Sequence, residues 1–223
     1  MPREQYQDRL EGLRGDVLYM SEVVAGRLRQ ALDALERKDE DLAREVIHGD
    51  DEINQQYLDL EGECIDLLAL QQPVAGDLRF IAASFKILTD LERIGDLAVN
   101  IGDYTIAAQR DVFPDVDVQR IGAETLSMLE DAMEAYEQEN TEQCWEIARR
   151  DDDVDAMCES ASEAIVRDLI TTGEMPEEEV EAMMPEVRRL LLTVRDLERV
   201  GDHAVNVAAR TLYMIENDDE LLE

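Results

Sequence analysis

The sequence has few positive charges and many negative ones. Only 21 of its 223 residues are Lys or Arg, whereas 55 are Asp or Glu, and the net charge is -34. A surface of this sign repels phosphate groups, which argues against a nucleic-acid binder or a protein that lies on an anionic membrane. Lys38 and Lys86 are the only lysines. This acidic, lysine-poor balance resembles that of cytoplasmic proteins in salt-accumulating archaea, and it predicts a halophilic protein.

Long apolar segments are also missing. The longest stretch without Asp, Glu, Lys or Arg is residues 67–76, far short of the roughly 20 apolar residues of a membrane helix. The first residues, MPREQYQDRLEG, lack the apolar segment of a secretion signal. We therefore expect a soluble, cytoplasmic protein without membrane insertion. Its three cysteines, Cys64, Cys144 and Cys158, form no CxxC pair and are expected to be small buried side chains in a reducing compartment.

Apolar residues spaced by threes and fours predict three long helices in the first half of the chain. These helices cover residues 13–35, 42–67 and 78 to beyond Tyr104, and no segment has the alternating pattern of a strand. The polar stretch RKDED separates the first two helices. Pro73 and Gly76 in QQPVAGD end the second helix, and Asp77 is expected to cap the third. Pro114 marks the boundary with the second half.

The second half repeats this plan. A shift of 101 residues places Asp50 on Asp151 and Ile53 on Val154, while the string DLERIGDLAVNI at residues 90–101 returns at residues 196–207 as DLERVGDHAVNV. Nine of these twelve positions are identical. The string is shifted by 106, so five extra residues lie near TTGEMPEEE, at a turn or early in the last helix. We predict an all-α fold of two tandem repeats, residues 1–112 and 113–223, each an antiparallel three-helix bundle, with six long helices in all.

The repeated string carries a pair of acidic residues on one face of a helix. Glu92 and Asp96 lie four residues apart, as do their counterparts Glu198 and Asp202. Like charges at this spacing cost a helix about 0.2–0.5 kcal/mol, so a pair that occurs twice indicates a compensating cation. One turn further on, an asparagine in each repeat offers an amide oxygen as an additional ligand.

A mirror estimate for each helical hairpin indicates what lies opposite these pairs. A turn near Pro73 places the first pair opposite the run DDEIN at residues 50–54, and a turn near Met175 places the second opposite DDDVD at residues 151–155. Clusters of oxygen ligands suit hard or borderline cations, and helical bundles build carboxylate metal sites in this way. The predicted metal ligands are Asp51, Glu92, Asp96 and Asn100 in the first repeat and Asp152, Glu198, Asp202 and Asn206 in the second. The alternative is that these acidic stripes are solvated surface, and spacing alone favours neither.

The remaining features of the chain do not point to catalysis. An oxygen-activating di-iron bundle uses two Glu-x-x-His pairs, whereas only His48 follows a Glu by three residues in this sequence, and His203 is expected on a helix surface rather than as a shared ligand. Arg93 and Arg199 are expected to neutralise neighbouring carboxylates. Gly95 and Gly201 inside helices indicate close approach of a neighbouring helix. Without a nucleophile elbow, a phosphate loop or a Cys–His pairing, we expect no enzyme activity.

Two segments resemble the signature of the PhoU family of phosphate-uptake regulators. They are ALQQPVAGDLRFIAASFKILTDLERIGDLAVNI at residues 69–101 and RDLERVGDHAVNVA at residues 195–208. The resemblance covers nearly the whole chain, including VIHGDDEIN and the two-copy layout. One departure is that the second repeat has TTGEMPEEE where the first has the QQPVAGDLR turn, so a partner contact made at this turn would be one-sided.

The resemblance implies a cytoplasmic, all-helical protein of two three-helix bundles, with multinuclear iron or zinc clusters at its ExxxD motifs. It also implies a negative regulator of phosphate transport. Such a regulator acts through the ATPase subunit of the high-affinity phosphate ABC transporter, a PstB-like protein, and in bacteria also involves a sensor kinase. A homodimer and a further transcriptional or signalling partner are expected as well, without direct contact to nucleic acid. The alternative function is a metal-binding or metal-storing helical scaffold unrelated to phosphate.

Overall fold

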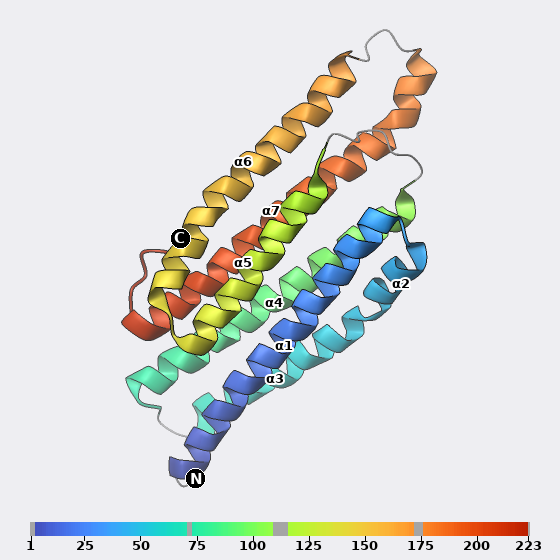
Figure 1. The fold of residues 1–223 in the computed structure, drawn as a ribbon. Coiled ribbons are helices and arrows are strands. Elements are labelled where there is room, and N and C mark those ends of the chain that lie inside the picture. The colour runs from blue at the N-terminus through green and yellow to red at the C-terminus, as the bar shows by residue number, and fades with distance from the viewer. Residues whose placement is uncertain (1–2, 71–72, 109–115, 172–175, 223) are drawn as a thin grey trace.

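The computed structural model describes residues 3–70, 73–108, 116–171 and 176–222, and nearly all of these are helical. The helices lie side by side in an elongated bundle (Figure 1). No strand occurs in the described ranges, and the all-α prediction is confirmed. The described helices are α1 (Arg3–Arg37), α2 (Glu40–His48), α3 (Asp50–Leu70), α4 (Ala75–Ala107), α5 (Val118–Gln138), α6 (Thr141–Thr171) and α7 (Glu177–Glu216).

The second predicted helix is divided at Gly49, which separates α2 from α3. Asp39 caps the start of α2 by accepting hydrogen bonds from two backbone N–H groups of the first turn. At the other end of α2, Arg27 of α1 donates to the carbonyl oxygens of Glu45 and Gly49 at 3.2 and 3.4 Å. A Cβ atom on Gly49 would lie 2.0 Å from this guanidinium, so glycine makes room for the contact. The prediction of six long helices holds except for this break.

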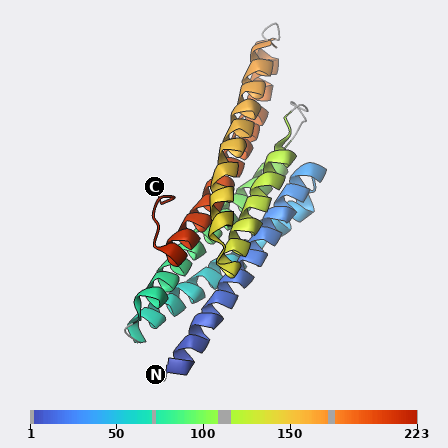
Figure 2. The same ribbon diagram turned by 60° about the vertical axis from the view of Figure 1, so that its left-hand side comes forward.

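Each repeat is a three-helix bundle when α2 and α3, which are separated by the break at Gly49, are counted as one helix. In the first repeat α4 packs against α1, α2 and α3, and in the second α7 packs against α5 and α6. Successive long helices run in opposite directions, as Figures 1 and 2 show. The two repeats are joined by contacts of α4 with α7 and of α1 with α5, and one continuous apolar core extends through both. The predicted boundary between residues 112 and 113 lies outside the described residues.

The two helices that carry the repeated string begin differently. α4 begins at Ala75, and the preceding Val74 makes no side-chain capping bond. The predicted cap at Asp77 is therefore wrong: this residue lies inside the first turn, where a negative charge favours the positive end of the helix dipole. α7 has 40 residues against 33 in α4 and contains Pro185, which agrees with an insertion early in the last helix. The boundary predicted at Pro114 lies outside the described residues.

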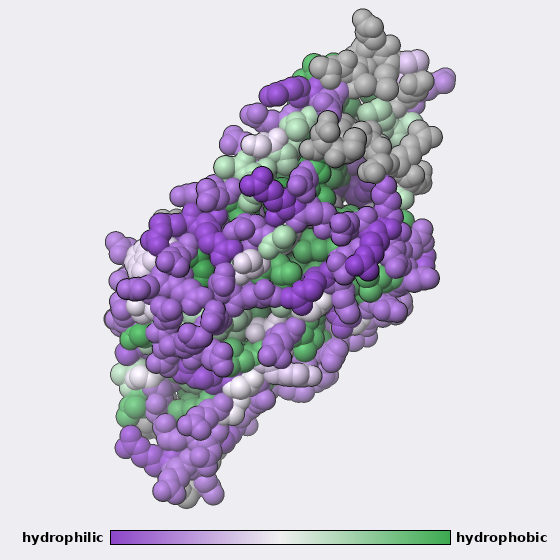
Figure 3. Space-filling view, viewed as in Figure 1, coloured by the Kyte–Doolittle hydropathy of each residue, from purple (hydrophilic) through white to green (hydrophobic). Residues whose placement is uncertain are grey.

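The interior is apolar, whereas the surface is mostly polar. All three cysteines are buried and free, as predicted, and burial raises the pKa of the Cys64 thiol to about 12. Figure 3 shows one face that is largely hydrophilic, with smaller hydrophobic patches among the polar residues. Among the described residues, no helix combines the length and the hydrophobicity that crossing a membrane requires.

Candidate metal centres

Glycines in the repeated string bring the second and third helices of each repeat close together. A Cβ atom on Gly95 of α4 would lie 3.3 Å from Ile53 of α3. In the second repeat, a Cβ atom on Gly201 of α7 would lie 3.4 Å from Oδ1 of Asp151 and 3.5 Å from Val154, both on α6. The distance at Gly95 is shorter than most Cβ contacts, and the distances at Gly201 are those of van der Waals contact, so the helices touch at both glycines. The predicted close approach is confirmed, and it places the acidic run of α3 or α6 beside the string.

The first carboxylate group comprises Asp50 of α3 with Glu92 and Asp96 of α4. Burial raises the pKa of Asp50, and the charge of Asp96 raises it further. Burial also raises the pKa of Glu92, Asp96 adds to this, and Arg93 opposes it. The Arg93 guanidinium lies 3.1 Å from Asp96 and 3.5 Å from Glu92, as the sequence predicts. The first repeat therefore supplies part of its own counter-charge.

The second carboxylate group comprises Asp151 and Asp155 of α6 with Glu198 and Asp202 of α7. Burial raises the pKa of Asp151 to about 6, with further contributions from the charges of Asp155 and Asp202. Burial and then the charge of Asp155 raise the pKa values of Glu198 and Asp202, and His203 and Arg199 oppose the shift at Asp202. Oδ1 of Asp151 is buried and accepts no hydrogen bond. Unlike the first group, these four carboxylates form no ion pair within the described ranges.

The donor atoms of both groups suit a hard cation, because all of them are carboxylate oxygens. The unpartnered Oδ1 of Asp151 and the raised pKa of its carboxyl group fit a position that lacks positive charge. As the side chains lie, however, no three carboxylate, imidazole or thiol groups in the described part of the chain converge closely enough to hold a metal ion. The chemical nature of these ligands thus suits a cation, but their present geometry does not. Binding a cation would require the side chains to rotate towards a shared point.

The predicted ligands opposite the string are one residue away from those that face it. Asp51 and Asp152 are exposed. Their neighbours Asp50 and Asp151 lie close enough to the string for their charges to interact with those of its acidic residues. The difference arises because a mirror estimate from a hairpin turn locates opposing residues only to within about one helical turn. A ligand role for Asp51 and Asp152 stays a prediction.

The predicted amide ligands lie where the two repeats meet. Asn100 of α4 donates from Nδ2 to Asp196 at 3.2 Å, and Asn206 of α7 donates to Asp90 at 3.3 Å. Because Asp90 and Asp196 occupy equivalent positions in the two strings, these contacts are reciprocal. The Asp196 side chain is fully buried, and Tyr104 also donates to it at 2.8 Å. The two asparagines therefore help to join α4 to α7, and their role as metal ligands stays a prediction.

His203 lies at the same junction. Its Nδ1 atom is 2.9 Å from Oδ1 of Asp90, and only 17% of its side chain is exposed. The expectation of a helix-surface histidine is wrong because this position, occupied by the buried Leu97 in the first repeat, faces the neighbouring repeat. Sequence reasoning missed the reciprocal contacts. The exchange of Leu97 for a histidine and the identity of the two aspartates are their only signals in the sequence.

The sequence and the fold of this chain are also similar to those of known proteins. The family model described as "PhoU domain" matches this sequence twice, at residues 17–105 and 118–211. The chain belongs to the PhoU family. Each match falls on one of the three-helix repeats, so the two carboxylate groups lie in separate PhoU domains.

Other PhoU proteins are similar over nearly the whole length of the chain. It is 33% identical over 218 residues to the "Phosphate-specific transport system accessory protein PhoU homolog" of Clostridium acetobutylicum, across 96% of each chain. It is 34% identical to the "Phosphate-specific transport system accessory protein PhoU homolog 1" of Methanothermobacter thermautotrophicus, across 96% of this chain and 95% of the relative. The crystal structure of PhoU from Pseudomonas aeruginosa has a TM-score of 0.86 at 31% identity, covering 96% of this chain and 100% of that one. The arrangement of the two repeats is therefore the PhoU fold.

Proposed function

We propose that this chain is an accessory protein that regulates phosphate transport by contacting a partner protein rather than by catalysis. The observation that carries the proposal is the near-full-length similarity to proteins named as accessory proteins of the phosphate-specific transport system. The similarity spans both repeats, which supports a role shared with these proteins. The expected partner is the ATPase subunit of the phosphate ABC transporter, and the expected effect is negative regulation of uptake.

Deletion of the gene tests this function directly. Phosphate uptake in phosphate-rich medium should rise in the deletion strain and return to its original rate when the gene is restored. A tagged copy of the chain, purified from phosphate-replete cells, should bring down the transporter ATPase. Unaltered uptake together with no recovered ATPase would contradict the proposal.

We further propose that the second carboxylate group binds a cation, with iron or zinc as the expected metals. Its four acidic side chains form no ion pair within the described residues, and apposed carboxylates either bind a cation or raise their pKa values and protonate. Asp151, Glu198 and Asp202 would hold the cation, whose positive charge would tie α6 to α7. In the first group Arg93 already supplies a positive charge, so we expect weaker binding there.

A homodimer is part of the same proposal. Three large apolar side chains, Leu58, Ile65 and Leu68, are exposed on α3. Their spacings of seven and three residues place them on one face of the helix, which supports burial against a second copy. Light scattering of the purified chain should give twice its mass of 25.3 kDa.

A second candidate function is a metal-binding scaffold with no role in phosphate transport. The four carboxylates of the second group favour this candidate, because they would explain cation binding without any regulatory partner. The deletion strain separates the two functions. A chain that binds metal while its deletion leaves phosphate uptake unaltered would be a scaffold.

A further inference from the structure

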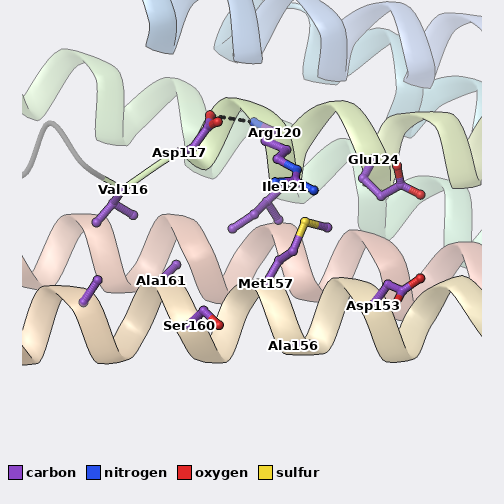
Figure 4. A pocket seen from close by; sticks show the side chains of 11 residues that line it. Val116, Asp117, Arg120, Ile121, Glu124, Asp153, Ala156, Met157, Ser160 and Ala161 are labelled. Atoms are coloured by element: carbon purple, nitrogen blue, oxygen red, sulfur yellow. Dashed lines mark hydrogen bonds between the residues drawn. The ribbon is translucent and has the colours of Figure 1, made fainter.

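A groove lies between the start of α5 and the middle of α6. Its volume is about 710 Å³, and Figure 4 shows Ile121 of α5 and Met157 of α6 pointing into it from opposite sides. Besides Met157, α6 contributes Asp153 and four small side chains, namely Ala156, Ser160, Ala161 and Ala164. Small side chains at these positions leave the space that a larger residue would fill.

The first repeat shows how the corresponding surface of α3 is covered. With the shift of 101 residues, Val118 at the start of α5 falls on Val17 of α1, but α1 begins about four turns earlier, at Arg3. In this additional part of α1, Arg9 forms an ion pair with Glu63 of α3 at 3.5 Å. Its apolar residues Tyr6, Leu10 and Leu13 are buried. The added turns are thus a helical cover on α3.

Among the described residues of the second repeat, no helix takes the position of this cover. Two groove residues, Ala161 and Ala164, are the counterparts of Leu60, which is buried, and of Glu63, which pairs with the covering helix. Within the described residues α4 ends at Ala107 and α5 begins with Val118, so no helical segment takes the place of the first turns of α1. Figures 1 and 2 show α6 extending past the start of α5. Within the described residues, the α3 surface is therefore covered by a helix, whereas the equivalent surface of α6 is not.

We propose that this groove binds an amphipathic helix of a partner protein, with a narrow apolar face and positively charged flanks. The apolar face would lie between Ile121 and Met157, where the small residues of α6 permit close approach. Asp117, Glu124 and Asp153 also line the groove, and Arg120 is its only basic lining residue. Glu124 is already paired with Arg150 at 2.8 Å.

The charged residues that line the groove indicate what kind of partner it binds. A rim with more acidic than basic residues attracts a basic helix and repels an anionic lipid surface or an acidic helix. The inference rests on the proposed function only in that the chain acts through a protein partner. It adds the surface that would bind the partner and the charge of the helix that would occupy it.

A peptide of defined composition tests the groove without any transporter component. The probe is a fluorescent peptide of residues 3–16 of this chain in which Glu4, Asp8, Glu11 and Asp16 are replaced by Lys, so that it keeps the apolar spacing of the covering helix and gains basic flanks. Fluorescence anisotropy at 0.15 M salt should show binding to the full chain. A second peptide, with Tyr6, Leu10 and Leu13 also replaced by Ser, should bind at least tenfold more weakly.

Two matched double variants locate the binding surface. Lysines at the exposed groove positions, A156K/S160K, should fill the groove, repel the basic peptide and weaken binding at least tenfold. A69K/A82K makes the same charge change at exposed positions of the first repeat and should alter binding less than twofold. Circular dichroism spectra and unfolding midpoints equal to those of the parent show that both variants are folded.

Three outcomes would overturn the proposal: no binding to the parent chain, equal binding of the two peptides, or equal weakening by the two double variants. A parent dimer that dissociates only in A156K/S160K would assign the groove to a second copy and would overturn it as well. Because the assay contains no transporter protein, its failure is distinguishable from a failure of the uptake experiment.

Discussion

At the residue scale, Asp151 combines a buried, unpartnered oxygen with several acidic neighbours. Its pKa in the folded chain is about 6, raised from 3.8 by burial and by the charges of Asp155 and Asp202. Without a bound cation, the folded state therefore binds more protons than the unfolded state between about pH 4 and pH 6. The free energy of unfolding falls as pH rises through this window, and the full penalty is present above it.

Replacing Asp151 by Asn should remove this penalty. In chelator-treated protein at pH 7, D151N is expected to be more stable than the parent by on the order of 1 kcal/mol, after allowance for solvent screening. The difference should disappear near pH 4, where the parent carboxylate is protonated. Thermal unfolding at several pH values measures the effect, with D66N, at an exposed position of α3, as the matched control. A gain that persists unchanged at pH 4 would show that packing, not charge, is responsible.

The buried carboxylate of Asp196 gives a second prediction at this scale. Tyr104 donates to it at 2.8 Å across the junction of the two repeats. Hydrogen bonds to charged groups contribute roughly 1.5–3 kcal/mol, so Y104F should lower the free energy of unfolding by about this amount. Y213F is the control, because the Tyr213 side chain forms no hydrogen bond within the described residues. Urea denaturation that gives equal losses for the two variants would contradict the view that this contact joins the repeats.

At the scale of the helices, the glycines differ in how much space surrounds their Cα atoms. A Cβ atom on Gly62 of α3 would have no neighbour within 4 Å, whereas one on Gly122 of α5 would lie 2.4 Å from a methyl group of Leu32 on α1. G62A should therefore stabilise the chain by about 0.5–1 kcal/mol through helix propensity alone. G122A gains the same propensity but must displace Leu32, and overpacking costs about 1–3 kcal/mol. Urea denaturation should show G62A above the parent and G122A below it, and equal stabilisation of both would mean that α1 and α5 do not pack this closely.

The order of the helices is predictable from the sequence, because the spacing of apolar residues indicates each helix and the repeat indicates the same order in both halves. The break at Gly49 is not, since it depends on the guanidinium of Arg27, which lies 22 residues earlier in the chain. The acidic residues opposite the string are predictable only to within about one helical turn, because side-chain direction depends on the rotation of α3 and α6 about their own axes. The contact of Asn100 with Asp196 joins positions 96 residues apart, and no local pattern indicates it.

At the scale of the whole molecule, the net charge of -34 should make folding depend on salt. Repulsion among exposed carboxylates extends over about 10 Å in 0.1 M salt but only about 3 Å in 1 M salt, so concentrated KCl should stabilise the compact state. A gain of about 2 kcal/mol would raise the unfolding midpoint by roughly 4–8 °C in a chain of this size. Thermal unfolding in dilute and in molar KCl measures this change. An unchanged midpoint would contradict the prediction of a salt-adapted surface.

The central claim is that the repeated string occurs twice because each repeat builds a carboxylate site for a cation. A bound metal would stabilise the folded state by about 2.7 kcal/mol at a hundredfold excess over its dissociation constant. The most direct measurement is the metal content of the parent chain, E92Q/D96N and E198Q/D202N, each purified without added metal. We predict that the parent retains iron or zinc and loses stability with chelator, and that each double variant loses the metal of its own repeat and keeps that of the other. A parent chain without metal that is indifferent to chelator, or an E198Q/D202N variant with full metal content, would show instead that the acidic stripes are solvated surface.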